Sequence, residues 1–187
     1  ILGYATDNAL LPKVLFMVIL APAIEEYIFR KQLIDRMHIY GEKLAVITSA
    51  LMFGLFHGNL SQLFYAFALG LVFGYVYLKT GKLRYSIGLH MLINFLGSVV
   101  GPFFLEKLAV LDTMETMDLA TLEPILPWLL GFGAYVLVLI GLAVTGLVLL
   151  CINKRRVSFA PAELELPKES RFRTVYLNVG MILLVLG

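Results

Sequence analysis

Residues 125–152 read ILPWLLGFGAYVLVLIGLAVTGLVLLCI, a long run without a single charged side chain. A helix needs about 20 apolar residues to cross the roughly 30 Å hydrocarbon core of a bilayer. This run is therefore long enough to span a membrane. The stretches 44–56, 63–78 and 86–105 also carry almost no charge, which predicts further membrane helices.

The composition of the whole chain agrees with this prediction. Of the 187 residues, 60% are hydrophobic and 15% are charged, and the mean hydropathy is +0.88; soluble domains carry about 25% charged residues. We predict an all-α fold: a polytopic transmembrane helical bundle of about six membrane segments, forming a single transmembrane domain over 1–187. The single cysteine, Cys151, excludes an internal disulfide framework.

The expected helices can be placed from the apolar stretches and the polar residues between them. They cover 12–36 (with Pro22 bending or interrupting the helix), 42–57, 60–79, 85–105, 125–152 and 174–187. A polar loop is expected at 153–173. Because the chain begins with Ile1 and stops inside an apolar run, we expect it to be a piece of a longer protein, with helices missing at its ends.

The basic residues are distributed unevenly among the predicted loops. Loops 30–43, 79–84 and 153–173 fall on one side and hold every lysine and arginine except Lys13 and Lys107. Lys and Arg are enriched in cytoplasmic loops, so we expect an integral, multi-pass membrane protein with these loops in the cytoplasm. The lipid bilayer is the expected partner of the basic loops. Without aromatic interleaving or a basic motif, they do not indicate a nucleic-acid partner.

Three pairs of glycines are spaced four residues apart. They are Gly54 and Gly58, Gly70 and Gly74, and Gly97 and Gly101. This spacing lets membrane helices approach one another closely, so we interpret it as helix packing.

Several ionisable or strongly polar residues fall within the predicted spans. They are Glu25, Glu26, Arg30, His57, His90 and Asn94. Such residues are rare in membrane helices, usually face the interior and mark functional sites. Glu26 and Arg30 are four residues apart, as are His90 and Asn94, so each pair shares a helix face. The set predicts a polar catalytic cavity between the helices.

Each of these residues also has a purely structural interpretation. Glu26 and Arg30 can form an ion pair that fixes two helices, and His90 and Asn94 can hydrogen-bond across a helix interface. His57, which precedes Gly58, can cap its helix at the interface. All of these structural interpretations would have to hold together, which favours one assembled site.

The residue types suit water attack on an amide carbonyl. A carboxylate accepts a proton from water, an imidazole shares that task, and an imidazole with a nearby amide donates to a developing oxyanion. The sequence contains neither the G-x-S-x-G motif of a serine nucleophile nor the H-E-x-x-H motif of the zincins. A proton-coupled transporter could use similar groups.

Three short motifs resemble those of one known family, the CAAX protease and bacteriocin-processing (CPBP, or Abi) intramembrane proteases, which are type II CAAX prenyl endopeptidase-like. EEYIFR (25–30) is similar to its E-E-x-x-x-R motif, FGLFH (53–57) to F-x-x-x-H, and HMLIN (90–94) to H-x-x-x-N/D. The order and approximate spacing agree, and the similarity covers about 14–104, the expected catalytic core. It also suggests a prokaryotic cell membrane.

The resemblance implies a role for each motif residue. Glu25 would activate water with help from His57, and His90 and Asn94 would stabilise the oxyanion. Glu26 and Arg30 would support the first motif. The cofactor stays unknown: the family has been described both as metalloproteases and as metal-free, glutamate-dependent enzymes. If the enzyme uses zinc, Glu25, His57 and His90 are the expected ligands.

The sequence thus predicts an intramembrane endopeptidase that hydrolyses peptide bonds of membrane-associated or lipidated protein or peptide substrates. A bacteriocin self-immunity protein of the same fold and a proton-coupled membrane transporter are the alternatives. In the predicted topology, His57 lies at the external end of its helix, whereas His90 lies only about one and a half turns from the cytoplasmic end of its helix. For both to meet Glu25, the helices must tilt or the turn at 58–62 must dip into the membrane.

Overall fold

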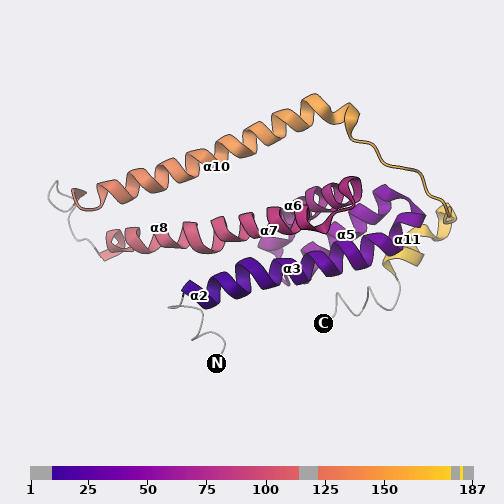
Figure 1. Ribbon diagram of the computed structural model, residues 1–187, viewed down its shortest axis with the longest axis horizontal. Helices are drawn as coiled ribbons and strands as arrows, with labels where there is room; N and C mark the ends of the chain where they lie inside the picture. The colour runs from indigo at the N-terminus through magenta and orange to yellow at the C-terminus, as the bar shows by residue number, and fades with distance from the viewer. Residues whose placement is uncertain (1–9, 114–121, 178–181, 183–187) are drawn as a thin grey trace. The chain divides into compact units, whose positions relative to one another are not determined.

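The computed structural model describes residues 10–113, 122–177 and 182, and every regular element in these ranges is a helix (Figure 1). The predicted all-α class is confirmed. Three helices in the described ranges are long and apolar enough to cross a membrane: Leu60–Thr80, Leu83–Leu111 and Leu126–Arg156. The count of six spans stays a prediction, and most of the expected segment 174–187 lies outside the described residues.

The chain divides into two compact units, which are described separately. Unit 1 comprises Ile1–Val18 and Leu92–Ser158, and unit 2 comprises Ile19–Met91 and Phe159–Gly187. Each unit therefore combines two separate stretches of sequence. The single domain expected over 1–187 stays a prediction.

The first predicted helix consists of a succession of helical elements. They are α2 (Leu10–Lys13), the π-helical η1 (Val14–Leu20), α3 (Ala21–Glu26), the π-helical η2 (Tyr27–Ile34), α4 (Asp35–Met37) and a final 3₁₀ turn, η3 (His38–Tyr40). Pro22 lies in the first turn of α3. Proline has no N–H and its ring crowds the preceding turn, which explains a departure from α-helical spacing just before it. The helical elements continue to Tyr40, beyond the predicted end at 36, and stop before Gly41, whose φ is +108°.

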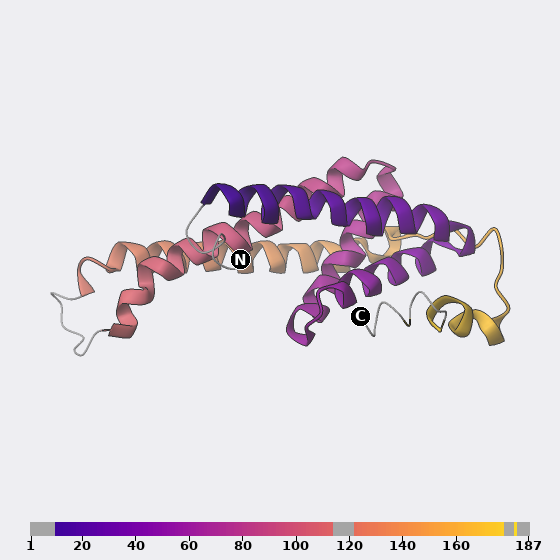
Figure 2. The same ribbon diagram turned by 90° about the horizontal axis from the view of Figure 1, so that it is seen from below.

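Two helices form the centre of unit 2. They are α5 (Glu42–Phe56) and α6 (Leu60–Thr80), which lie side by side (Figure 2). A Cβ atom on Gly70 would lie only 2.9 Å from the Cα atom of Ala50, and one on Gly74 would lie 3.3 Å from the side chain of Val46. Small residues thus allow α6 to approach α5 closely, which confirms the packing interpretation for this pair of glycines.

The length of α5 differs from that of a membrane span. Its 15 residues cover about 22 Å at 1.5 Å per residue, which is shorter than the roughly 30 Å hydrocarbon core. Consequently α5 is not among the three helices long enough to span. It ends at Phe56, and His57 is its C-cap residue. α6 begins after Asn59, whose side chain accepts a hydrogen bond from the backbone N–H of Gln62 at 2.8 Å.

The C-terminal part of unit 2 returns to the start of α5. Residues 159–166, here called the docked segment, contact the turn before α5. The backbone N–H of Ala160 donates to Glu42 Oε2 at 2.7 Å, and those of Glu163 and Leu164 donate to the carbonyl of Ile39 at 2.9 Å. The polar loop expected over 153–173 is therefore only partly irregular, because α11 (Lys168–Tyr176) begins within it.

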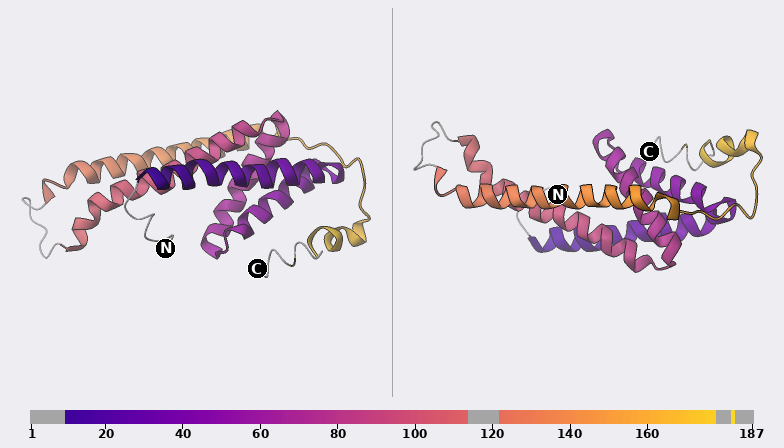
Figure 3. Two further views of the ribbon diagram at one scale, coloured as in Figure 1. Left: turned by 60° about the horizontal axis from the view of Figure 1, so that its bottom comes forward. Right: turned by 90° about the horizontal axis from the view of Figure 1, so that it is seen from above.

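Unit 1 is built around α8 (Gly101–Leu108) and α10 (Leu126–Asn153), which run alongside each other (Figure 3). The hydroxyl of Tyr135 donates to the carbonyl of Leu96 at 2.9 Å, and its ring stacks on Phe104 with centroids 5.9 Å apart. In contrast to the expectation for a packing glycine, no described atom lies within 4 Å of a Cβ built on Gly97. At Gly101, the other member of this pair, a Cβ would lie 3.6 Å from the Tyr135 hydroxyl, so the packing interpretation finds support at Gly101 and none at Gly97.

Candidate active site

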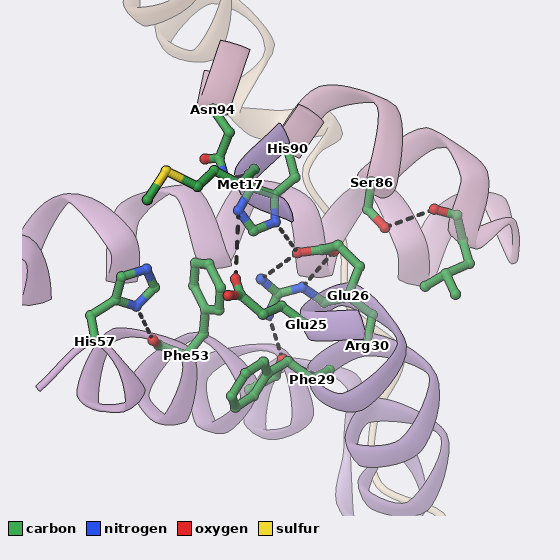
Figure 4. A network of polar contacts seen from close by, with 12 residues as sticks. Met17, Glu25, Glu26, Phe29, Arg30, Phe53, His57, Ser86, His90 and Asn94 are labelled. Atoms are coloured by element: carbon green, nitrogen blue, oxygen red, sulfur yellow. Dashed lines mark hydrogen bonds and ion pairs between the residues drawn. The ribbon is translucent and has the colours of Figure 1, made fainter. Parts of the chain in front are cut away.

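A buried ion pair lies at the centre of unit 2 (Figure 4). Arg30 Nε donates to Glu26 Oε2 at 3.0 Å, and Nη2 donates to Oε1 at 3.2 Å. Both side chains are fully buried. Two parallel hydrogen bonds between a guanidinium and a carboxylate fix both distance and orientation. The predicted pairing of Glu26 with Arg30 is thus present.

Ser49 on α5 completes the hydrogen bonding of this arginine. Arg30 Nη1 donates to Ser49 Oγ at 2.7 Å, and the Ser49 hydroxyl donates to the carbonyl of Phe29 at 2.7 Å. The sequence analysis missed Ser49. Its position one helical turn before Phe53, itself one turn before His57, was the available indication.

Aromatic rings cover the remaining faces of the guanidinium. Arg30 Cζ lies 4.8 Å from the ring centre of Phe53 on α5 and 5.9 Å from that of Phe73 on α6. Cation–π contacts are strongest where water is excluded, as it is here. The guanidinium is therefore held by side chains from α5 and α6 as well as by Glu26.

His90 lies between the two glutamates. It belongs to α7 (Leu83–Phe95); its Nδ1 is 3.2 Å from Glu26 Oε1, and its Nε2 is 3.7 Å from Glu25 Oε2. Because a carboxylate accepts hydrogen bonds, Nδ1 carries the proton and donates to Glu26. The other ring nitrogen, Nε2, then faces Glu25.

The two adjacent glutamates have different environments. The side chain of Glu26 is 0% exposed, whereas that of Glu25 is 19% exposed. Glu26 is bound by Arg30 and His90, while Glu25 lies beside His90 Nε2 at the more open side of the cluster (Figure 4). A carboxylate that only positions other groups can be buried and fully bound, as Glu26 is, whereas one that transfers protons needs access to water, as Glu25 has.

His57 approaches the same cluster from the end of α5. Its Nδ1 donates to the carbonyl of Phe53 at 2.8 Å, so a neutral ring keeps its lone pair on Nε2. The rings of His57 and His90 both lie edge-on to the Phe53 ring, with centroids 4.9 and 5.4 Å away. His57 and His90 thus share one aromatic neighbour, and the convergence of His57 on Glu25 stays a prediction.

Asn94 lies one helical turn after His90, in the part of α7 that belongs to unit 1. Its side-chain amide donates to the carbonyl of Met17 at 2.8 Å, also in unit 1. The amide therefore has a structural partner, and its role at an oxyanion stays a prediction.

The cluster contains side chains of the types that bind metal ions. Within the described ranges, no three His, Cys, Asp or Glu residues form a group that could hold a metal ion. Both ring nitrogens of His90 face glutamates, and His57 Nδ1 faces a backbone carbonyl. In both histidines Nδ1 is taken up by another partner, so only the Nε2 atoms and Glu25 could ligate a metal, and the zinc ligand set Glu25, His57 and His90 stays a prediction. No step below passes through a metal.

Comparison with known proteins agrees with the motifs. Residues 7–96 match the model of a family described as type II CAAX prenyl endopeptidase Rce1-like. This part of the chain is therefore similar to that family. All three motifs lie within the matched residues, and the resemblance proposed from the sequence is confirmed.

A curated relative gives a second match. The membrane-embedded CAAX protease MroQ of Staphylococcus aureus (strain USA300) is 32% identical over 88 residues. The aligned part covers 43% of this chain and 36% of the relative, so the chain spans little more than a third of that protein. No solved structure gives a significant match.

Proposed function

We propose that this chain carries the catalytic centre of an intramembrane endopeptidase that uses activated water. Its substrates are membrane-associated proteins or peptides, in keeping with the name of the Staphylococcus aureus relative, a membrane-embedded CAAX protease. The observation that carries the proposal is the contrast between Glu26, which is fully buried and bound, and Glu25, which is partly exposed beside His90 Nε2.

In the proposed mechanism Glu25 takes a proton from the attacking water. At the same time the oxygen of that water bonds to the scissile carbonyl carbon. The Nε2 lone pair of His57 shares in orienting or deprotonating that water. A catalytic carboxylate needs access to water, and the exposed fraction of Glu25 provides that access. Glu26 lacks this access and is also bound on both sides, which suits it to hold other groups in position.

His90 is proposed to transfer and donate protons. Glu26 holds the proton on Nδ1, so Nε2 is the position at which the ring gains or loses one. The 3.7 Å separation between Nε2 and Glu25 Oε2 is short enough for a small side-chain movement to allow proton transfer. Once protonated, Nε2–H can donate to the developing oxyanion or to the leaving amine, and Asn94 is proposed as a further donor.

The experiment is a peptidase assay of the purified chain in lipid nanodiscs against membrane-anchored peptide reporters. We expect Glu25→Gln, His57→Ala and His90→Ala each to lower kcat at least 100-fold, and Glu163→Gln, in the docked segment, to leave it unchanged. Full activity of Glu25→Gln would refute the assignment of the base. Metal analysis of the same samples tests whether the enzyme depends on zinc. Stoichiometric zinc that is lost in both histidine variants would favour a metalloprotease.

A further inference from the structure

A groove opens between the end of α6 and the start of α7, within unit 2 and apart from the candidate active site. Its volume is about 540 Å³. Its lining residues are Val76, Thr80, Arg84, Tyr85, Gly88 and Leu89. Both helices are among the three that can span a membrane, so the groove lies on a surface that lipid can reach.

The lining of the groove is mostly apolar, and the groove is open. Val76 and Leu89 supply its aliphatic walls, and no described atom lies within 4 Å of a Cβ built on Gly88. Because Gly88 has no side chain, this part of the α7 surface is free of side-chain atoms. A space of this shape and polarity suits a hydrocarbon chain.

The rim of the groove carries an oriented positive charge. Arg84 donates to the Tyr85 hydroxyl at 3.2 Å, and its guanidinium lies 5.0 Å from the Tyr85 ring centre. Among the described residues, no carboxylate pairs with Arg84 or with nearby Lys82. By contrast, Lys79, near the end of α6, forms an ion pair with Glu42, with 2.6 Å between Nζ and Oε2. The rim thus holds the positive charge of Arg84, which no described acid neutralises, and Lys82 lies two residues away in the sequence.

We infer that this groove binds one anionic phospholipid. The acyl chain lies along Val76, Gly88 and Leu89, and the phosphate pairs with the guanidinium of Arg84. Arg–phosphate contacts are directional and charge-assisted, and basic residues at the ends of membrane helices attract anionic headgroups. Lys82 adds to the local charge. The inference rests on the groove and its rim, and it does not depend on peptidase activity.

Native mass spectrometry of the chain in detergent tests the site with two probes of identical acyl chains, phosphatidylglycerol and phosphatidylcholine. We expect one phosphatidylglycerol to be retained about tenfold more tightly than phosphatidylcholine. Arg84→Gln should remove this preference, and Gly88→Leu, which fills the groove, should weaken retention of both lipids. Arg155→Gln changes an exposed arginine after α10 and serves as the matched control; it should change neither lipid.

Equal retention of the two lipids, or an unchanged preference in Arg84→Gln, would overturn the inference. So would displacement of the lipid by millimolar inorganic phosphate, because that outcome indicates a site for phosphate alone. If Gly88→Leu fails to fold, a phosphatidylglycerol with a photoreactive acyl chain provides the second measurement. Crosslinks concentrated in residues 76–89 support the site. Crosslinks spread equally over α6, α7 and α10 indicate general lipid contact and contradict it.

Discussion

Ser49→Ala tests whether the buried ion pair depends on a residue outside the three motifs. The substitution removes the acceptor of Arg30 Nη1 and the donor to the carbonyl of Phe29, both at 2.7 Å. Ser49 and Arg30 are fully buried, so water cannot replace the lost partner without a rearrangement. A buried polar group left without a hydrogen bond costs about 1–3 kcal/mol, and more when it is charged. We expect Ser49→Ala to destabilise the chain by about 3 kcal/mol.

Ser86 offers a matched control. It is as fully buried as Ser49, but its hydroxyl donates to the carbonyl of Leu83 in its own helix, at 3.0 Å. Its removal leaves no charged group unsatisfied, so Ser86→Ala should cost about 1 kcal/mol. Ser49→Thr keeps a hydroxyl and should recover part of the stability lost in Ser49→Ala.

The assay is reversible unfolding in mixed micelles of a mild detergent and sodium dodecyl sulfate, which gives the free energy of unfolding of each variant. If Ser49→Ala costs no more than Ser86→Ala, the reasoning is refuted, because the buried guanidinium then does not need this acceptor. A second measurement is the histidine NMR titration. Loosening Arg30 should move the His90 resonances, whereas Ser86→Ala should leave them in place.

Three further predictions concern the ion pair, the contact between α5 and α6, and the docked segment. Arg30→Lys keeps the positive charge but replaces a two-pronged donor with a point charge. Through its lost hydrogen bonds it should lower the free energy of unfolding by about 1–3 kcal/mol, measured in the same micelles; a neutral result would show that charge alone suffices. Gly70→Ala places a methyl group 2.9 Å from the Ala50 Cα atom and should cost about 1–3 kcal/mol, again by unfolding; no change would mean that the helices separate freely. At Glu42, burial by itself raises the pKa, but hydrogen bonds from Lys79 and the N–H of Ala160 outweigh it and lower the pKa. The stabilisation is therefore present above the unfolded-state pKa and is lost as the pH falls through the lower folded-state value. Protection of residues 159–166 against hydrogen exchange, expressed relative to the intrinsic exchange rate at each pH, should fall below about pH 4. Glu42→Gln should remove most of this pH dependence, and an unchanged dependence would contradict the assignment.

The sequence predicted those parts of the site that depend on spacing within one helix. Glu26 and Arg30 are four residues apart and form the expected pair. The positions of His57 and His90 followed from their motifs, but their approach to a common aromatic ring depends on how α5 and α7 pack. No local pattern reports that geometry.

Other features could not be read from the sequence because they depend on tertiary contacts. Ser49 contacts an arginine 19 positions earlier, and a serine within an apolar helix gives little indication of such a partner. The stretch over 42–57 resembled a membrane span by hydropathy, although the helix proved too short. The docked segment binds the turn before α5 largely through backbone groups, which any sequence could provide.

The docked segment determines how far the chain can be shortened. The family match ends at residue 96, but unit 2 resumes at 159 and supplies partners for Ile39, Glu42 and Thr48. A polypeptide that ends after α7 would keep every candidate catalytic residue and still lack part of its own fold. We expect such a truncated polypeptide to be unstable and to be rescued by fragment complementation when residues 159–187 are supplied as a separate chain.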